Sequence, residues 1–404
     1  MRKFLRIFGL LVAVGFASPE ARAQLDNSAF VGNRLSTAQS NGTFDEIGCD
    51  MSDSSLWSTR ARDLRISLTS FTFFKNNEYF NQIIEGQTLF GTQLNPQLVY
   101  YPSPTLRLEA GVFLWKDFGN PRLQLVRPTF RGTWTKGRSQ FILGNIRPHL
   151  NHDYIEPLFN FERVILRPLE EGLQYRYLGR RLFLDAWVDW QRQQYRFSNF
   201  QEELAGGLSS SWCVSPAGSR WQITLPLQFT ATHKGGQIDT LDQPLQTVFN
   251  QAVGLVLQRE LGSNLNAVRL NAYVLGFQDR SGTSRLPFQS GTGLYLNSTL
   301  ETKYGDAMLS YWQGRRFLAP LGGDLFQGAS RTVNNPGYTE AHRRLLLLRL
   351  LRDFRIADPA ALTVRVEPVY DLNAKRLDFS FGVYLNFRQE WLLGNVAQRV
   401  RVGP

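Results

Sequence analysis

The sequence has no long apolar run after its first residues. Beyond residue 23, no stretch approaches the roughly 18 uninterrupted apolar residues that a membrane-spanning helix requires. The densest run, 345–348, is followed at once by Arg349. Signals for helices are also few, whereas aromatic residues are frequent. These absences exclude a helical membrane protein and favour a chain built from β-strands.

Common catalytic and cofactor-binding motifs are absent as well. The chain after residue 23 contains no G-x-S-x-G elbow, no P-loop and no G-x-G-x-x-G turn. It has only four histidines, and two of them, His233 and His342, lie at expected loop edges without an evident acid-base partner. We therefore expect no cofactor, no metal and no enzymatic activity. A hydrolase that assembles Ser, His and Asp or Asn from separate strands would leave no such signal, so an enzyme stays an alternative.

The N-terminus is typical of a secretory signal peptide. Three basic residues among the first six precede the apolar run 8–17, and Ala21-Arg22-Ala23 offers a small-x-small cleavage site. Removal of residues 1–23 leaves 41 basic and 33 acidic residues, a net charge of +8. Both signs are interleaved and basic residues are not clustered, so nucleic acid is not an expected partner.

Apolar and polar residues alternate in segments of about ten residues between positions 62 and 387. The last segment shows this best, because one face carries Leu377, Phe379, Phe381, Val383, Leu385 and Phe387 while the residues between them are mostly polar. A strand that lies between lipid and water needs this pattern.

The connectors between these segments are short and long by turns. The short ones are 101–104, 135–138, 179–180, 215–219, 261–264, 304–306 and 357–360, and all carry turn residues. Between them lie 74–86, 117–121, 147–170, 192–203, 233–244, 278–287, 315–340 and 371–375. Bacterial membrane barrels have short periplasmic turns and longer external loops. The sequence therefore predicts an all-β fold, a transmembrane antiparallel β-barrel of about 16 strands over residues 62–387.

On these features the chain resembles the porin-like outer-membrane β-barrels of bacteria. The signal peptide, the alternating connectors and the aromatic-terminated segment 382–387 carry the resemblance. It implies a cell outer-membrane location, contact with membrane lipids and lipopolysaccharide, recognition of the last strand by the barrel-assembly machinery, and association into a homo-oligomer. One departure is the tail 388–404, because in many such barrels the terminal aromatic ends the chain. Residues 24–61 would form a periplasmic leader or a partial plug, and 388–404 a periplasmic tail.

Strand parity predicts charged side chains on the inner face, where they avoid the cost of facing lipid. The predicted pore-lining residues are Arg65, Arg107, Glu109, Arg176, Asp185, Asp189, Arg269, Glu301, Arg349, Arg365, Glu367 and Asp378. About 16 strands enclose an interior too wide for side chains alone to fill. The leading hypothesis is a channel for passive or substrate-specific diffusion of small polar solutes, with anions as one candidate class. The alternatives are charge ladders that merely hold the lumen together, a non-channel component in assembly, secretion or surface attachment, and an enzyme that uses the loop 147–170.

The third external connector, 147–170, is the richest in functional side chains. Its candidates are His149, His152, Asp153 and Glu156, whose spacing would place them on one side of a helical turn and could present ligands to a divalent ion. Prolines at 148 and 157 limit such a helix to about two turns, which favours hydrogen bonding or ion pairing over metal binding. In porins of this size the third external loop often folds inward, so the resemblance implies a constriction loop here.

The two cysteines, Cys49 and Cys213, could form one disulfide bridge in an oxidising compartment. Both are expected near the periplasmic end of the barrel interior, where a bridge would pin residues 24–61 as a partial plug. The alternative is two unpaired small residues.

Overall fold

Sixteen antiparallel strands form a closed barrel. The computed structural model describes residues 37–38, 44–45, 60–216, 218–239, 241–262, 265–357 and 360–396. The barrel strands are β3 (Asp63–Phe80), β4 (Glu85–Ser103), β5 (Leu106–Asp117), β6 (Leu125–Lys136), β7 (Ser139–Asn145), β8 (Glu171–Leu178), β9 (Leu182–Arg192), β10 (Glu203–Cys213), β11 (Gln222–Lys234), β12 (Gln246–Glu260), β13 (Leu265–Asp279), β14 (Ser290–Thr302), β15 (Gly305–Arg315), β16 (His342–Ala357), β17 (Ala360–Asp371) and β18 (Arg376–Asn395). The predicted signal peptide and Cys49 lie outside the described residues.

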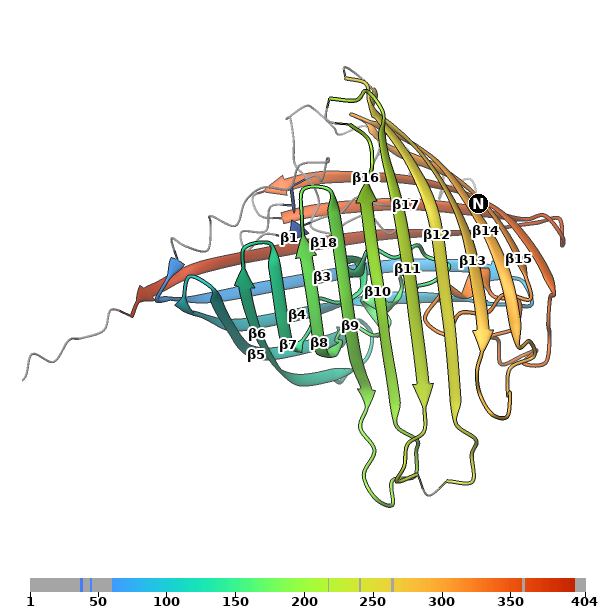
Figure 1. Ribbon diagram of the computed structural model, residues 1–404, viewed down its shortest axis with the longest axis horizontal. Helices are drawn as coiled ribbons and strands as arrows, with labels where there is room; N and C mark the ends of the chain where they lie inside the picture. The colour runs from blue at the N-terminus through green and yellow to red at the C-terminus, as the bar shows by residue number, and fades with distance from the viewer. Residues whose placement is uncertain are drawn as a thin grey trace, which may run out of the picture.

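Each strand pairs with its sequence neighbours, and β18 closes the barrel against β3 (Figure 1). The predicted all-β barrel of 16 strands is therefore confirmed. Two further strands, β1 (Thr37–Ala38) and β2 (Phe44–Asp45), pair only with each other. Within the described residues, no helix is both long and apolar enough to cross a membrane.

The two faces of each strand differ as the alternation predicts. In β11, Leu225 and Leu227 are exposed on the outer face, whereas Gln228 and Thr230 are buried on the inner one. The outer surface carries many exposed leucine, valine, phenylalanine and tryptophan side chains. An apolar outer belt around a polar interior is the arrangement that a barrel needs in a lipid bilayer.

Two boundaries differ from the sequence interpretation. The expected first loop, 74–86, shrinks to four residues, because Lys75, Asn77 and Tyr79 point into the barrel and β3 continues to Phe80. The last strand runs on to Asn395, past the expected barrel end at Phe387, because residues 388–395 pair with the beginning of β3. Polar residues that face a lumen look like loop residues in the sequence, which explains both shifts.

Two long external connectors fold into the barrel and fill its middle. The segment 146–170 contains a 3-10 turn, η2 (His149–His152), and a short helix, α3 (Arg163–Leu166), and 316–341 contains η3 (Asp324–Phe326). Leu158 and Phe159 of the first segment and Leu318 and Phe326 of the second belong to one apolar cluster with side chains of the wall. The interior is therefore packed at mid-height, with cavities on either side.

Candidate functional site

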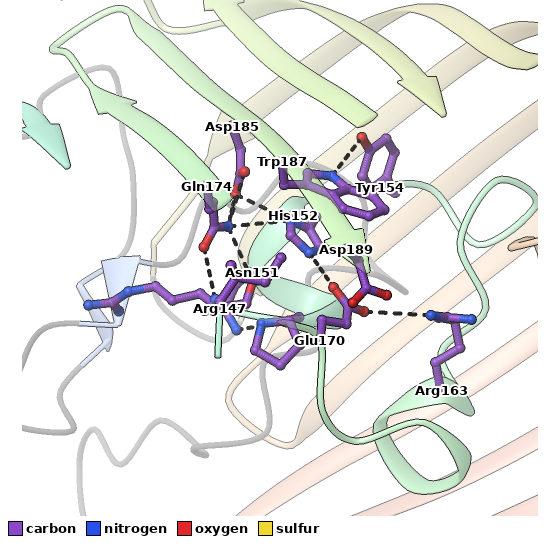
Figure 2. A network of polar contacts seen from close by, with 12 residues as sticks. Arg147, Asn151, His152, Tyr154, Arg163, Glu170, Gln174, Asp185, Trp187 and Asp189 are labelled. Carbon is purple, nitrogen blue, oxygen red and sulfur yellow. Dashed lines mark hydrogen bonds and ion pairs between the residues drawn. The ribbon is translucent and has the colours of Figure 1, made fainter. Parts of the chain in front are cut away.

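The first part of the inward segment 146–170 is held to the wall by polar contacts (Figure 2). The Gln174 side chain of β8 forms two hydrogen bonds with the backbone of Arg147. It accepts from the Arg147 N–H at 2.8 Å and donates to the Arg147 carbonyl at 3.2 Å. Further along, the Tyr154 hydroxyl donates to the Phe229 carbonyl at 3.0 Å and accepts from the Trp187 indole at 3.1 Å. The segment is thus fixed by three neighbouring parts of the wall.

His152 lies at the centre of this network. Its Nε2 is 2.8 Å from Glu170 and its Nδ1 is 3.4 Å from Asp185, and all three side chains are fully buried. The ring stacks on Trp187 with a centroid separation of 4.5 Å. Arg163 approaches the other oxygen of Glu170 at 3.8 Å, which extends the network toward the external side.

The electrostatics make His152 a structural cation. Burial lowers the pKa of His152, but the carboxylates of Asp185 and Glu170 outweigh burial and raise the pKa to about 9. Both ring nitrogens then donate to acids, so the ring has no lone pair with which to accept a proton from a substrate. A catalytic role for this histidine is therefore poorly supported.

The other candidate residues of the loop, Asp153 and Glu156, have partners different from those of His152. Asp153 has a positive φ of 57°, which ends the 3-10 turn, and its carbonyl accepts from Gln228 at 2.8 Å. Glu156 instead forms a buried ion pair with Arg349. Burial raises the pKa of Glu156, and Arg349 partly offsets this. The side chain of His149 lies outside the described part.

A shared metal site on this loop is thus not formed by the described residues. The expected helical turn ends after one 3-10 turn, and the acids of the loop go to different partners. Across the described part of the chain, no three His, Cys, Asp or Glu side chains are arranged to hold a metal ion.

The twelve residues predicted to line a pore lie on inner faces of the strands, and all but the half-buried Arg65 are buried. Most join ion pairs, such as Arg107 with Glu109 at 3.0 Å and Arg269 with Glu301 at 3.0 Å. Lys75 adds a further pair with Glu162 of the inward segment at 3.2 Å. These pairs neutralise charge inside the barrel, while a role in lining a pore stays a prediction.

Two cavities lie on opposite sides of the inward segment. The larger, which we call the vestibule, has a volume of about 1270 Å³ and is lined by the external ends of strands and by both long connectors. The smaller has a volume of about 210 Å³ and is lined by Glu109, Arg131, Arg388 and several amide side chains. Pro168 and Leu169 line both cavities, so this short stretch separates them.

A second polar site, missed by the sequence analysis, lies at the external ends of β11 and β12. His233 Nδ1 is 2.8 Å from the Thr247 hydroxyl, and the two residues are direct partners in the strand register. Strand parity puts both on the outer face, because Thr232 and Val248 beside them follow the inner face. His233 also borders the vestibule, at the external rim of the wall. No pattern in the sequence indicates that positions 233 and 247 are neighbours. The pairing register of β11 and β12 brings them together.

Arg280 lies beside this pair. Its backbone N–H donates to the Thr247 carbonyl at 2.8 Å, and its exposed guanidinium bonds the side chain of Gln278. None of the described carboxylates contacts the His233 ring. The site is therefore a histidine-hydroxyl pair with an adjacent cation.

Cys213 is buried and disulfide-bonded near the periplasmic end of β10. The other cysteine of the chain, Cys49, lies outside the described residues. The pairing of the two therefore stays a prediction, as does a plug formed by residues 24–61.

Comparison with solved structures shows the fold. The outer membrane protein OprD from Pseudomonas aeruginosa superimposes with a TM-score of 0.50 at 11% identity, over 82% of this chain and 95% of that one. OmpTdeltaL8, a loop L8 deletion mutant of an outer membrane protein of Vibrio cholerae, gives 0.49 at 10% identity, over 81% and 100%. The fold of the porin-like outer-membrane barrels, which the sequence resembles, is thereby confirmed for this chain. No curated protein matches the chain in sequence.

A family model identifies the chain more closely. The model described as "Lipid A 3'-O-deacylase-type" matches residues 56–396, which include the whole barrel. This match overturns the expectation of no enzymatic activity, because the family bears the name of an enzyme. That expectation relied on absent sequence motifs, which cannot reveal groups brought together by strand register. The chain belongs to the lipid A 3'-O-deacylase-type family.

Proposed function

We propose that the protein hydrolyses an acyl ester of lipid A, or of a closely similar lipid, with His233 and Thr247 as the reacting pair. The hydrogen bond between His233 Nδ1 and the Thr247 hydroxyl on the outer face carries this proposal. Family membership supplies the reaction class. The pair has the base and the hydroxyl that acyl transfer requires.

The height of the pair in the wall suits a lipid ester. Phe229 and Phe249 form an aromatic contact on the outer face, with ring centroids 5.7 Å apart, and Leu227 and Val253 continue the apolar belt below them. The pair of His233 and Thr247 lies two residues beyond Phe249, or about 7 Å along the strand. We infer that the acyl chains of a lipid meet its headgroup at this level, where the apolar belt ends.

The charge around the pair suits an anionic headgroup. Arg280 is exposed next to Thr247, whose carbonyl accepts from its backbone N–H. Guanidinium groups bind phosphate with good geometry. We infer that Arg280 holds a headgroup phosphate while the ester lies against Thr247.

The reaction then follows acyl-transfer chemistry. His233 Nδ1 takes the proton of the Thr247 hydroxyl, and Oγ1 attacks the ester carbonyl carbon. The bond from that carbon to the sugar oxygen breaks, and this oxygen takes the proton from the imidazolium. Water, deprotonated by His233, then hydrolyses the acyl-threonine, which releases the fatty acid and restores the pair.

The test is mass spectrometry of lipid A incubated with the purified protein in lipid vesicles. We expect loss of one ester-linked acyl chain from lipid A. In His233→Gln and in Thr247→Val, the rate of this loss should fall by about 100-fold or more. His342→Gln is the matched control, because His342 is an exposed histidine at another strand end. Unchanged lipid A with the wild-type protein, or full activity in both variants, contradicts the proposal.

Passage of small anionic solutes through the lumen is a second candidate. The stretch at Pro168 and Leu169, which lines both cavities, favours it. Basic side chains outnumber acidic ones in the lining of the vestibule, which favours anions. In a planar bilayer we expect anion-selective conductance that increases in Leu169→Ala but not in Leu225→Ala, on the outer face. A silent bilayer argues against this candidate.

A further inference from the structure

The barrel wall is lowest at β7 and β8. These neighbouring strands have 7 and 8 residues, whereas every other barrel strand has at least 11 (Figure 1). A tilted strand needs about 9 to 11 residues to cross the hydrocarbon core of a bilayer. The wall at β7 and β8 therefore ends below the external surface of the membrane.

The backbone explains why the wall ends here. Gly144 has a φ of +96°, and a Cβ atom at this position would collide with the Phe130 carbonyl oxygen, so glycine is required. Asn145 then caps the edge of β6, its Oδ1 accepting from the Phe130 N–H at 2.7 Å. After these two residues the chain leaves the wall and enters the barrel.

The two flanking strands continue past this point. Pairing of β6 with β7 begins at Arg131, although β6 starts at Leu125, and pairing of β8 with β9 ends at Asp189, although β9 continues to Arg192. Residues 125–130 and 190–192 therefore face each other across an opening two strands wide. We call this opening the wall notch.

The vestibule reaches the wall notch from inside. Leu125 and Trp190 at its edges and Leu166 and Leu169 behind it all line the vestibule. Leu166 is 38% exposed and Val126, on the outer face of the β6 edge, is 56% exposed. Apolar side chains are therefore exposed both on the outer face of the barrel beside the notch and on the vestibule side behind it.

Basic side chains frame this apolar surface on the external side. Arg167 and Arg192 are exposed and line the vestibule, and Arg127 reaches Glu171 across the end of β7 at 2.9 Å. Cations above an apolar path match a lipid with an anionic headgroup and hydrocarbon chains. The lipid that meets the notch at this height is one of the external leaflet.

We propose that the wall notch admits an acyl chain of an anionic external-leaflet lipid sideways into the vestibule, between β6 and β9. The headgroup binds Arg167 and Arg192, and the chain lies against Leu166 and Leu169. This lipid site goes beyond the proposed hydrolysis and does not require it, because it uses none of the residues of the pair formed by His233 and Thr247.

The test is fluorescence quenching by lipid. Leu166→Cys carries a bimane label, and the protein is placed in phosphatidylglycerol vesicles whose acyl chains are brominated. Ala329→Cys is the matched control, because Ala329 also lines the vestibule but lies on the other long connector. We expect bimane emission at position 166 to fall with the brominated fraction, while emission at position 329 stays constant.

Loss of quenching in a brominated zwitterionic lipid, or in the variant with Arg167→Glu and Arg192→Glu, supports the headgroup assignment. Equal quenching at both positions, or none at position 166, overturns the proposal. Disulfide-linked dimers of Leu166→Cys without quenching also overturn it, because a second copy then covers the notch. The same measurement in His233→Gln keeps the outcome independent of hydrolysis.

Discussion

At the scale of single residues, the interior depends on buried charges that are almost all paired with opposite ones. Glu170, His152 and Asp185 form a fully buried acid-base-acid row, and Arg176 contacts Asp185 at 3.3 Å. Removing one member would leave a buried charge without its partner, which costs more than the pair contributes. This row therefore fixes where the segment 146–170 lies.

His152 gives a pH-dependent prediction. Its pKa in the folded state is about 9, above the ordinary value of 6.5, so its stabilisation is complete below about pH 6.5. This stabilisation is lost as the pH rises through about 9. We expect the Tm of the wild-type protein in detergent to fall between pH 7 and 10 more steeply than that of His152→Gln. His342→Gln, at an exposed histidine, should keep the wild-type slope, and identical slopes for all three would contradict the assignment.

The sequence predicts some of these residues but not their partners. Strand parity placed Asp185 and Arg176 on the inner face, because parity is a local property of a strand. It could not show that His152 would reach Asp185, since that contact depends on how an irregular loop folds inward. His233 and Thr247 were missed for a related reason, because they are fourteen positions apart in the chain, on two strands joined by a loop.

At the scale of elements, each strand is defined by the difference between its two faces. Replacing Leu225 of β11 by Arg places a charge in the apolar belt and should destabilise the inserted barrel by about 2 to 4 kcal/mol. Thr232→Arg, on the inner face of the same strand and lining the vestibule, should be tolerated. Denaturant unfolding from lipid vesicles measures both, and equal losses would mean that the two faces are not distinct.

Gln228 shows why burial has to guide the choice of such a control. It has the same inner parity as Thr232, but it is fully buried and anchors the inward segment through the Asp153 carbonyl and the Ile155 N–H. Strand parity predicts only the direction in which a side chain points. The packing of a distant loop decides whether the space beside it is free.

Strand lengths were the least predictable feature of the elements. Alternation and turn residues gave the number of strands, but β3 and β18 extend into stretches that look like loop and tail. The short strands β7 and β8 end at contacts made by Gly144 and Asn145 with β6. Such ends depend on pairing across the sheet and have no signature in the strand itself.

At the scale of the whole molecule, we expect connectors at the two ends of the barrel to differ in their exposure to reagents outside intact cells. Gly282, in an external connector with open space around it, should label as Gly282→Cys with an impermeant thiol reagent. Lys303→Cys, in the turn between β14 and β15, should label only after the cells are opened. Gly322 is unsuitable, because that external connector folds inward and a side chain there would strike the Pro157 carbonyl. Equal labelling of both positions would contradict the topology.

The last prediction concerns the disulfide, which would join the segment before the barrel to the end of β10. Cys213 is disulfide-bonded, and the sequence offers Cys49 as its only partner within one chain. A bridge closes a loop of more than 160 residues. By the chain-entropy model, closing a loop of that size removes about 5 kcal/mol of conformational entropy from the unfolded state. Mass spectrometry after alkylation without reduction should find one linked peptide pair that contains both cysteines. Two alkylated thiols, or a link between two copies of the chain, would instead leave residues 24–61 untied to the barrel.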